Sequence, residues 1–403
     1  MKIRIHRGQN QIGGSVIEIS TETTRIFFDI GANMDDAKAS IVPGVEGLFF
    51  GKRNTDAVFL THYHADHAGL LCRMLSGIPV YMGKTAFGIF KVGEAYRNHN
   101  IVFQPQFVSD QTKIRIGDIT VTPFRCDHSA YDAYMYLAEA DGEKVLYTGD
   151  FRSHGRQDFE KLLSVLPKVD TLITEGTSLS RDLPSRSVTE DALIEMGTEL
   201  LKDLMGPVFV VMSPMNIDRL ITCYQIARQT GRIFLIDPYA VELAKAAGQE
   251  KTIPAGSFPV PDPIHDPGIR IFWTDGKMIP VRLRGYGKAG ISMRGIQKQE
   301  KFLMCVRPGM RHFLHQLSGH VNFRGGTLIY SMFAGHLELP FYSNFMDFME
   351  QKGLERHVLH TSGHADREAI DMLIRTVEPK TIMPVHTEAA EWFMRYEPEI
   401  KIY

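Results

Sequence analysis

The stretch Val58 to Gly69 reads V-F-L-T-H-Y-H-A-D-H-A-G, an apolar run followed at once by three histidines and an aspartate. Imidazole nitrogens and carboxylate oxygens are suitable ligands for zinc, and open catalytic sites use them in preference to four thiolates. A lone histidine is usually structural, but burying four such groups together without a metal would cost much free energy. This histidine-rich stretch therefore predicts a metal site at the end of a strand, with the candidate ligands His62, His64, Asp66 and His67.

Three later segments repeat this design, because each is a β-type run that ends in a residue able to bind a metal. They are Phe124 to His128, Leu146 to Asp150 and Ile382 to His386. Taken singly, a strand-terminal aspartate is more often an ordinary turn residue, and a single histidine is usually structural. Their order after the histidine-rich stretch favours one composite site, to which the last residue of each segment contributes.

The composition is that of a folded protein with ample material for a large core. Of 403 residues, 44% are hydrophobic and 23% charged, which excludes a disordered or fibrous chain and suggests two or three domains. The first residues alternate as a strand does and lack signal-peptide features, and no apolar run approaches the roughly 20 residues needed to cross a bilayer. Four cysteines without C-x-x-C spacing suggest neither a disulfide framework nor a thiolate site. We therefore expect a cytoplasmic protein with no membrane partner.

Three parts follow one another along the chain by their local patterns. Residues 1–179 contain short β-rich runs that end in turns, which suggests two sheets facing a core. Residues 180–355 alternate strands and helices in the manner of a parallel α/β unit, and residues 356–403 return to strand and helix. Helices are expected, among others, at Leu70 to Leu75 and at Glu388 to Arg395.

The order of the candidate ligands resembles the metallo-β-lactamase superfamily, which has an H-x-H-x-D-H motif followed by a later histidine, an aspartate and a final histidine. The resemblance implies an αββα sandwich that holds two zinc ions, with Mn²⁺ as a candidate substitute. It assigns His62, His64 and His128 to one zinc, Asp66, His67 and His386 to the other, and Asp150 to the bridge between them. Asp29 matches the first family motif and would orient a metal-bound histidine from the second shell of the site.

The pair of cations that the resemblance implies would supply the chemistry. In such sites the ions lie roughly 3.5 to 4 Å apart and can share a hydroxide while they bind a substrate oxygen. Metal coordination lowers the pKa of water enough to supply hydroxide near neutral pH, so no protein nucleophile is needed. The chain has no G-x-S-x-G elbow that would mark a serine nucleophile. Asp66 and Asp150 are therefore predicted to be catalytic as well as metal-binding.

A second tier of residues resembles the β-CASP nucleases, the branch that includes RNase J. Glu175 matches their first accessory motif, His364 the second and His386 the third. The resemblance covers nearly the whole chain and implies that residues 180–355 form a β-CASP-like α/β domain inserted into the metallo-β-lactamase domain. The flanking residues would then form the two parts of that domain.

The two accessory residues that are not metal ligands suit the cleavage of a P–O bond, which requires protonation of the leaving oxygen. His364 would donate that proton, and Glu175 would orient the ring and keep it charged. The alternative is that His364 only caps the backbone of the helix expected at Asp366 to Val377. Ser362 and the neighbouring amides are candidates for binding a phosphate, because a helix N-terminus presents free N–H groups.

The segment Arg270 to Arg324 carries eleven Lys or Arg against two acidic residues, although the whole chain has a net charge of -2. Aromatic residues are interleaved with these cations, namely Phe272, Trp273, Tyr286 and Phe302. Such a mixture favours a phosphate backbone and base stacking on single strands, although charge runs are more often solvated faces. Within this segment we expect Arg282 and Arg284 to bind substrate.

A shorter segment, Ser213 to Arg219, resembles the base of the insert in RNase J-like proteins. Ser213, Asn216 and Arg219 are candidate phosphate contacts there, with a helix N-cap as an equally good explanation. Both explanations place the segment between the expected strand Val208 to Met212 and a following helix.

Three departures from the family pattern concern the substrate side and assembly. The third accessory motif commonly reads P-V-H-G-E, whereas Thr387 follows His386 here, which would reshape the turn without removing the ligand. The glycine-rich RNA-facing loop of RNase J-like inserts is not evident, and Ser331 to His336 takes its place. The sequence ends 17 residues after His386, so we expect the C-terminal domain that helps RNase J assemble to be missing, with a homodimer as a candidate assembly.

These observations favour a two-zinc hydrolase that cleaves phosphodiester bonds of RNA or single-stranded nucleic acid by metal-activated hydroxide. The alternative is a metallo-hydrolase for a lactone, thioester or cyclic nucleotide with the insert as a lid, because one fold hosts many reactions. A nucleic-acid-binding or regulatory protein with a degenerate site is disfavoured, since no expected ligand is missing. The pair Glu175 and His364 separates the first two, because metal hydroxide does not need it to hydrolyse an ester.

Overall fold

The computed structural model describes residues 1–34, 41–181, 185–249, 258–274 and 286–403. The chain forms two compact units, one from Met1–Ser187 together with Gly363–Tyr403 and the other from Val188–Ser362. The second unit is thus inserted into the first along the chain, with boundaries a few residues beyond the predicted 180 and 355.

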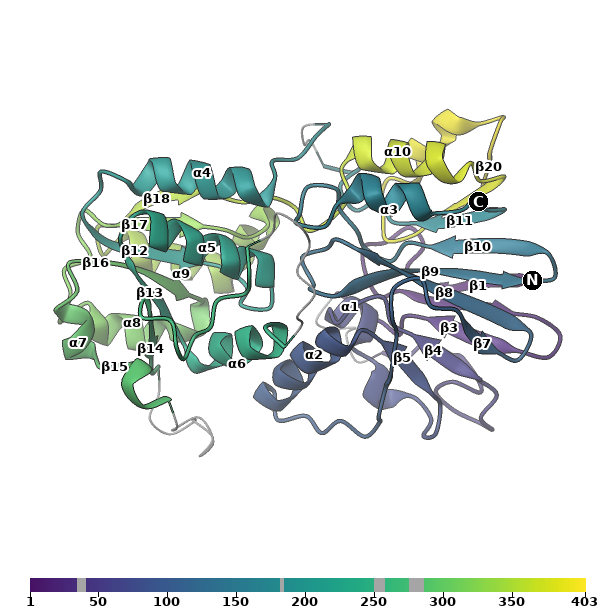
Figure 1. The fold of residues 1–403 in the computed structure, drawn as a ribbon, viewed down its shortest axis with the longest axis horizontal. Coiled ribbons are helices and arrows are strands. Elements are labelled where there is room, and N and C mark those ends of the chain that lie inside the picture. Colours follow the sequence, from purple (N-terminus) through teal and green to yellow (C-terminus); the bar gives the residue numbers. More distant parts are fainter. Residues whose placement is uncertain (35–40, 182–184, 250–257, 275–285) are drawn as a thin grey trace. The chain divides into compact units, whose positions relative to one another are not determined.

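The first unit contains two sheets (Figure 1). One sheet runs in chain order through β1 (Lys2–Arg7), β2 (Val16–Ser20), β3 (Arg25–Phe28), β4 (Ala57–Phe59), β5 (Val80–Met82) and β6 (Gln106–Phe107). The other has the order β20-β19-β11-β10-β9-β8-β7, with the strands β7 (Ile114–Ile116), β8 (Ile119–Cys126), β9 (Ala133–Ala140), β10 (Glu143–Tyr147), β11 (Thr171–Thr174), β19 (Thr381–Pro384) and β20 (Lys401–Ile402).

The core between these sheets is apolar and rich in aromatic rings, because alternate residues of each strand point inward. Phe28 of the first sheet stacks on Tyr136 and Tyr147 of the second, with both pairs of ring centroids 5.6 Å apart. The outer face of the second sheet packs against α3 (Phe159–Val165) and α10 (Arg367–Val377), and α2 (Lys84–Tyr96) lies beside β5 (Figure 1). The arrangement is the predicted αββα sandwich.

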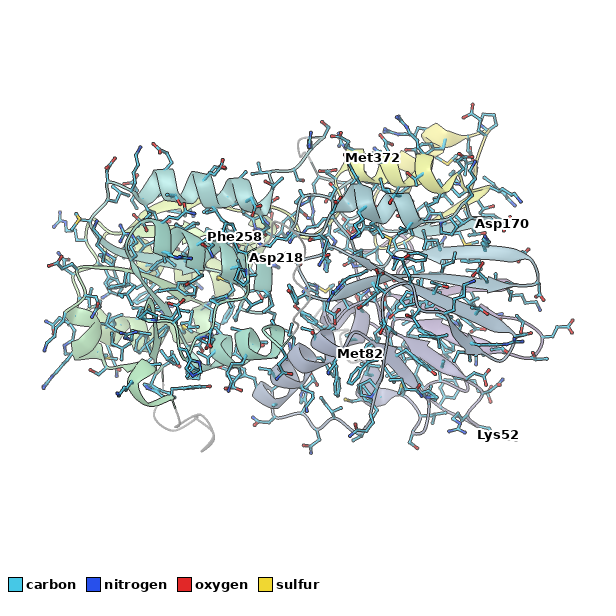
Figure 2. All side chains as sticks on the ribbon, viewed as in Figure 1. Lys52, Met82, Asp170, Asp218, Phe258 and Met372 are labelled. Carbon is cyan, nitrogen blue, oxygen red and sulfur yellow. The ribbon has the colours of Figure 1, made fainter. Side chains whose placement is uncertain are left out.

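Helix α10 is the clearest amphipathic helix of this unit, and its apolar residues join the outer core against the second sheet. Met372, labelled in Figure 2, is partly buried against this core. The α-helices expected at Leu70 to Leu75 and at Glu388 to Arg395 are wrong in type. The structure has short 3₁₀ helices there, at Leu71–Arg73 and Ala390–Tyr396. Pro398 disfavours the α conformation at Glu397, the residue before it, which is consistent with the second helix ending at Tyr396.

The strands that precede the predicted site residues end at a common edge of each sheet. In the first sheet β3 and β4 are parallel, so Asp29 and the histidine-rich stretch emerge side by side. In the second sheet β10, β11 and β19 are parallel, and β8 shares their direction because β9 is antiparallel to both β8 and β10. The residues after these strands, His128, Asp150, Glu175 and His386, therefore emerge at one edge, where α/β folds usually bind ligands.

The second unit is built on a parallel sheet with the order β15-β14-β13-β16-β12-β17-β18. Its strands are β12 (Gly206–Val211), β13 (Ile233–Ile236), β14 (Ile269–Phe272), β15 (Gly290–Ile291), β16 (Lys301–Val306), β17 (Thr327–Tyr330) and β18 (Glu355–Val358). Helices α4 (Glu190–Leu201), α5 (Ile217–Gln229) and α6 (Pro238–Ala247) pack on one face, and α8 (Arg311–Leu317) and α9 (Pro340–Glu350) pack on the other (Figure 1).

The aromatic residues interleaved with the basic segment belong to the core of this unit, which corrects the expectation of a stacking surface. Strands β14 and β16 lie inside the sheet, and Phe272 and Phe302 are buried in its core. Tyr286 is buried in the core on the other face, with Trp273 packed against it. These aromatic residues have a structural role, while Arg282 and Arg284 lie outside the described residues.

A buried ion pair joins α4 to α5 in the second unit. The Arg219 guanidinium donates to both carboxylate oxygens of Glu190, at 3.3 and 3.0 Å, and both side chains are fully buried. Thr222 also donates to Glu190, and the remaining Arg219 donors face Ser331 and residues 360–361. The pair is thus enclosed by partners within its own unit.

No helix in the described parts of the chain combines the length and the apolarity that crossing a membrane would require.

Replacing Arg219 with methionine should lower the free energy of unfolding of the second unit by about 3–5 kcal/mol, because it leaves the Glu190 carboxylate buried and unpaired. Urea unfolding can be followed through Trp273 in a Trp392→Phe background, because the chain has two tryptophans. The double change Arg219→Met with Glu190→Leu should recover much of the loss. A single variant as stable as the parent would show that the pair is not buried.

Candidate metal centre

Two groups of potential metal ligands meet at the common strand edge of the first unit. One contains His62, His64 and His128, and the other contains Asp66, His67, Asp150 and His386; within each group one ligand atom per residue lies within 4.8 Å of all the others. These are the seven residues that the sequence analysis assigned to two zinc ions. Their roles as ligands stay a prediction, but the structure brings them together in the predicted grouping.

Asp150 lies between the two groups. Its Oδ2 atom is 3.8 Å from His62 Nε2 and 3.9 Å from His128 Nε2, in the first group. The same oxygen is 3.2 Å from His67 Nε2 and 3.7 Å from His386 Nε2, in the second. This carboxylate oxygen is therefore near both groups and could hold an ion in either of them.

Several buried atoms of these groups lack a hydrogen bond of good geometry within the described residues. They are Nε2 of His62, Nε2 of His67 and both carboxylate oxygens of Asp150. Buried polar atoms are otherwise almost always paired, because an unpaired one loses its hydration without compensation. Imidazole nitrogens and carboxylate oxygens are also the atoms that zinc binds in catalytic sites. The donor set thus fits two ions of the zinc class.

The electrostatics of the site divide its imidazoles into two kinds. Burial lowers the pKa of His62 and His128 well below the ordinary value. Burial also acts against protonation of His67 and His386, but the nearby carboxylates, Asp150 first among them, outweigh it and raise the pKa of both rings. Burial alone would raise the pKa of Asp150, and the imidazoles around it lower that pKa instead. The raised pKa values mean that His67 and His386 hold a proton more readily beside these carboxylates, and a bound cation would compete with that proton.

Asp29 connects the histidine-rich stretch to the core. Its carboxylate accepts hydrogen bonds from the Thr61 backbone at 2.8 Å, the Thr61 hydroxyl at 2.8 Å and the Tyr147 hydroxyl at 2.8 Å. It also lies 2.7 Å from His67 Nδ1, so the Nε2 atom of that ring faces the ligand group. Asp29 has a φ of 58°, a left-handed conformation that Asp and Asn tolerate better than most residues. It is therefore placed to orient a candidate ligand, as predicted.

Glu175 and His364 form a third group with Asp150 and His386. His364 Nδ1 lies 3.1 Å from Glu175 Oε2 and 3.5 Å from Asp150 Oδ2. Glu175 is fully buried, and its Oε1 accepts the backbone N–H of Phe151, the residue after Asp150, at 2.8 Å. The His364 side chain is 21% exposed, so the ring spans from a buried carboxylate to the surface of the site.

The helix-capping alternative for His364 is not what the structure shows. Helix α10 begins at Arg367, and its N-cap is Asp366, whose side chain accepts the Ala369 N–H at 2.9 Å. His364 lies two residues before that cap and faces Glu175 instead. The ring is thus part of the site rather than of the helix end.

The structure contradicts one of the predicted substrate contacts in the second unit and leaves others as predictions. Arg219 is wrong as a phosphate contact, because its guanidinium is fully buried and bound to Glu190 and Ser331. Asn216 is the N-cap of α5 and accepts the Arg219 N–H at 3.0 Å. Ser213 and Ser362 are partly exposed, and their role in binding substrate stays a prediction.

Hydroxyl groups that orient the ligands were missed by the sequence analysis. Thr61 lies 3.0 Å from His62 Nδ1, Tyr147 donates to Asp29, and Thr177 lies 2.7 Å from His386 Nδ1. The backbone carbonyl of Gly363 plays the same part for His128 Nδ1. Threonine and tyrosine are ordinary residues of strands and their ends, so their residue types do not indicate a role at a metal site. Their only sequence signal is that they lie next to a candidate ligand or close to Glu175.

Comparisons with known families and proteins agree with this geometry. Residues 29–215 match the family described as "Beta-lactamase superfamily domain", and residues 354–396 match the "Zn-dependent metallo-hydrolase RNA specificity domain". The chain is 25% identical over 252 residues to the RNase J-like protein of Methanocaldococcus jannaschii, covering 55% of this chain and 54% of the relative. It is 21% identical to Ribonuclease J 1 of Streptococcus pyogenes, covering 94% and 67%. The chain therefore spans about half to two thirds of the length of these relatives.

A solved structure shares the fold over the full length. It is a protein of unknown function from Enterococcus faecalis, with a TM-score of 0.79 and 22% identity, covering 100% of this chain and 97% of the other. The two-unit architecture therefore occurs in an independently determined structure.

Adding zinc to metal-free protein should raise the melting temperature of the first unit, because an ion that binds only the folded state stabilises it by about 2.7 kcal/mol at 100 times its Kd. The shift should be larger at pH 8 than at pH 6, since raised pKa values keep protons on His67 and His386 that a metal must displace. Calorimetry at both pH values measures it, with Asp66→Ala as the control. An equal rise in melting temperature in Asp66→Ala would show that zinc binds at another site.

Replacing Asp29 with asparagine should weaken zinc binding about 10–100-fold, the usual cost of losing a partner that orients a ligand. Asparagine tolerates the left-handed backbone, so the change tests the carboxylate rather than the turn. Competition with a chromophoric chelator measures the affinity. The matched control is Asp141→Asn, which changes an exposed carboxylate at a φ of 54° and should leave zinc affinity unaltered. Equal zinc affinities in the two variants would show that the Asp29 carboxylate does not support zinc binding.

Proposed function

The chain belongs to the metallo-β-lactamase superfamily, in the β-CASP branch that carries the RNA specificity domain, and from this premise we propose that it cleaves phosphodiester bonds of RNA or single-stranded nucleic acid. That it is a metal-dependent hydrolase follows from the family and from the clustered His and Asp ligands. The finer proposal concerns which bond is broken.

The observation that carries the proposal is the contact between His364 and Glu175 beside the metal groups. A phosphodiester releases an alkoxide that needs a proton, and a histidine within hydrogen-bond reach can supply one. Glu175 holds His364 Nδ1 at 3.1 Å, which leaves the other ring nitrogen to face a substrate. A pair of zinc ions, when bound, would supply hydroxide and stabilise charge on the phosphate.

The remaining residues of the chain hold this arrangement in place. Asp150 positions its carboxylate against both ligand groups, and Phe151, the next residue, donates its N–H to Glu175. The proton donor and the metal groups are therefore linked through two adjacent residues. The match to the RNA specificity domain includes both His364 and His386, which supports RNA as the substrate.

Replacing His364 with alanine should lower kcat on single-stranded RNA by about 10²–10⁴-fold while leaving the zinc content unchanged, because it removes a proton donor and no predicted ligand. End-labelled RNA with zinc or manganese, followed on denaturing gels, measures the rate, and metal analysis measures the zinc. The matched control is His99→Ala, which removes an exposed histidine paired only with Glu94 among the contacts described.

The same samples should be tested on a lactone and on a thioester. Wild-type protein that hydrolyses either ester and leaves RNA intact, with His364→Ala no slower, would overturn the proposal in favour of a small-molecule hydrolase. RNA cleavage that survives in Asp66→Ala, which lacks a predicted metal ligand, would point to a contaminating nuclease.

A further inference from the structure

Thr177 makes two contacts with one candidate ligand, His386. Its hydroxyl lies 2.7 Å from the ring Nδ1 atom and 3.0 Å from the backbone carbonyl oxygen of the same residue. Both residues are buried, so no water competes for these bonds. Nothing in the sequence analysis had assigned Thr177 a role.

The single proton of this hydroxyl fixes which nitrogen of a neutral His386 ring carries a proton. A threonine hydroxyl has one proton to donate, and a backbone carbonyl can only accept. If the hydroxyl donated to Nδ1, its oxygen and the carbonyl oxygen would face each other 3.0 Å apart without a proton between them. The O–H therefore donates to the carbonyl, and Nδ1–H donates to the hydroxyl oxygen. A neutral His386 then carries its proton on Nδ1 and has its lone pair on Nε2, the atom that faces the other ligands.

The backbone of His386 makes this double contact possible. Its φ of 52° is left-handed, which is uncommon for a residue other than glycine and turns the carbonyl back toward Thr177. The backbone N–H of His386 donates to the Gly8 carbonyl at 2.7 Å, which holds the turn from the other side. A strained conformation of this kind persists only where its surroundings enforce it.

Thr387 supplies a second hydroxyl contact to the same region. Its Oγ1 donates to the Gly176 carbonyl at 2.7 Å and accepts the Ala389 N–H at 3.1 Å. Thr387 stands where the family motif commonly has glycine, which could make neither bond. Residues 386–387 are therefore joined to residues 176–177 by two hydroxyls, which together we call the hydroxyl clamp.

We propose that the hydroxyl clamp, Thr177 and Thr387, positions His386 as a metal ligand, with Thr177 selecting the ring form whose Nε2 atom is free to bind. This inference rests on the proposed two-metal site but not on the identity of the substrate. Both members are positioning residues, because they act through His386.

The clamp shares a turn with the partner of the proton donor. Glu175 precedes Thr177 by two residues, and the Thr177 N–H points to Glu175 Oε2 at 3.4 Å. One turn after β11 thus contacts His386 through a hydroxyl and His364 through a carboxylate. A shift of this turn would move a metal ligand and the proton donor together.

The test compares Thr177→Val, which keeps the shape and removes the hydroxyl, with Thr177→Ser, which keeps the hydroxyl. Zinc stoichiometry and affinity are measured by chelator competition, and the absorption spectrum of the Co²⁺-loaded protein reports ligand geometry at the second ion. We expect the valine variant to bind the zinc of the Asp66, His67 and His386 group about 10–100-fold less tightly than wild type with an altered cobalt spectrum, and the serine variant to match wild type.

Thr387→Gly is the second variant, and it covers the case in which Thr177→Val does not fold. It restores the common motif residue and should weaken the same zinc by up to about tenfold, while Thr387→Ser should not. The melting temperature of each metal-free variant is measured alongside, since a merely structural role would lower it without changing the zinc affinity of the folded protein.

Each outcome separates the clamp from the proposed function. Wild-type protein that binds two zinc ions, together with valine and glycine variants that bind them equally well, overturns the clamp alone. Wild-type protein that binds no zinc overturns the proposed function and the clamp with it. Two bound zinc ions, weakened as expected in the variants, support the clamp even where RNA is not cleaved.

Discussion

The buried Asp150 carboxylate lies within 4 Å of five imidazole rings, and the rest of the structure depends on stabilising that cluster. A buried carboxylate is costly unless it is paired, and buried imidazoles resist protonation. The nearby carboxylates raise the pKa of His67 and His386, whereas burial lowers the pKa of His62 and His128 well below the ordinary value, so only the first two rings gain protons readily from this environment. Two divalent cations would satisfy all of these groups at once. Metal binding, folding of the strand ends and protonation are therefore one coupled equilibrium in this unit.

Shared strand direction brings the groups together, and a second layer of contacts then orients them. Asp29 and the histidine-rich stretch follow parallel strands of one sheet, and the other candidate ligands follow strands of common direction in the second. Side chains placed only by strand ends would still rotate. Asp29 on His67 and Thr177 on His386 each bind the ring nitrogen that a metal does not use. Asp29 and His386 also share a left-handed backbone, which non-glycine residues adopt only rarely.

The clustering of the candidate ligands could be predicted from the sequence, because strand-terminal histidines and aspartates recur in an order that is rare without a metal. The orienting hydroxyls could not be predicted, because a threonine in a sequence can equally well face water or a neighbouring side chain. Only the tertiary contacts single out Thr177 and Thr61. Arg219 and the basic segment show the opposite error. A count of charges along the chain cannot tell which cation faces inward, and Arg219 is buried because Glu190 on a neighbouring helix neutralises it. Likewise, Phe272 and Phe302 belong to interior strands of a parallel sheet, whose residues are buried on both faces.

The choice of substrate bond lies in the delivery of protons rather than in the ligand set. The same cluster of histidines and aspartates could serve ester or phosphodiester hydrolysis, because both need activated water and charge stabilisation. What the structure adds to the ligand set is a histidine held by a buried carboxylate, and our proposal gives it the role of protonating the alkoxide released from phosphorus. Burying that carboxylate is tolerable because it accepts the Phe151 N–H and faces His364, so the group that orients the proton donor is also bonded to the chain beside Asp150. The proposed proton donor and the candidate metal ligands are consequently anchored at one strand edge, and a hydrolytic site without a protein nucleophile would need such fixed placement.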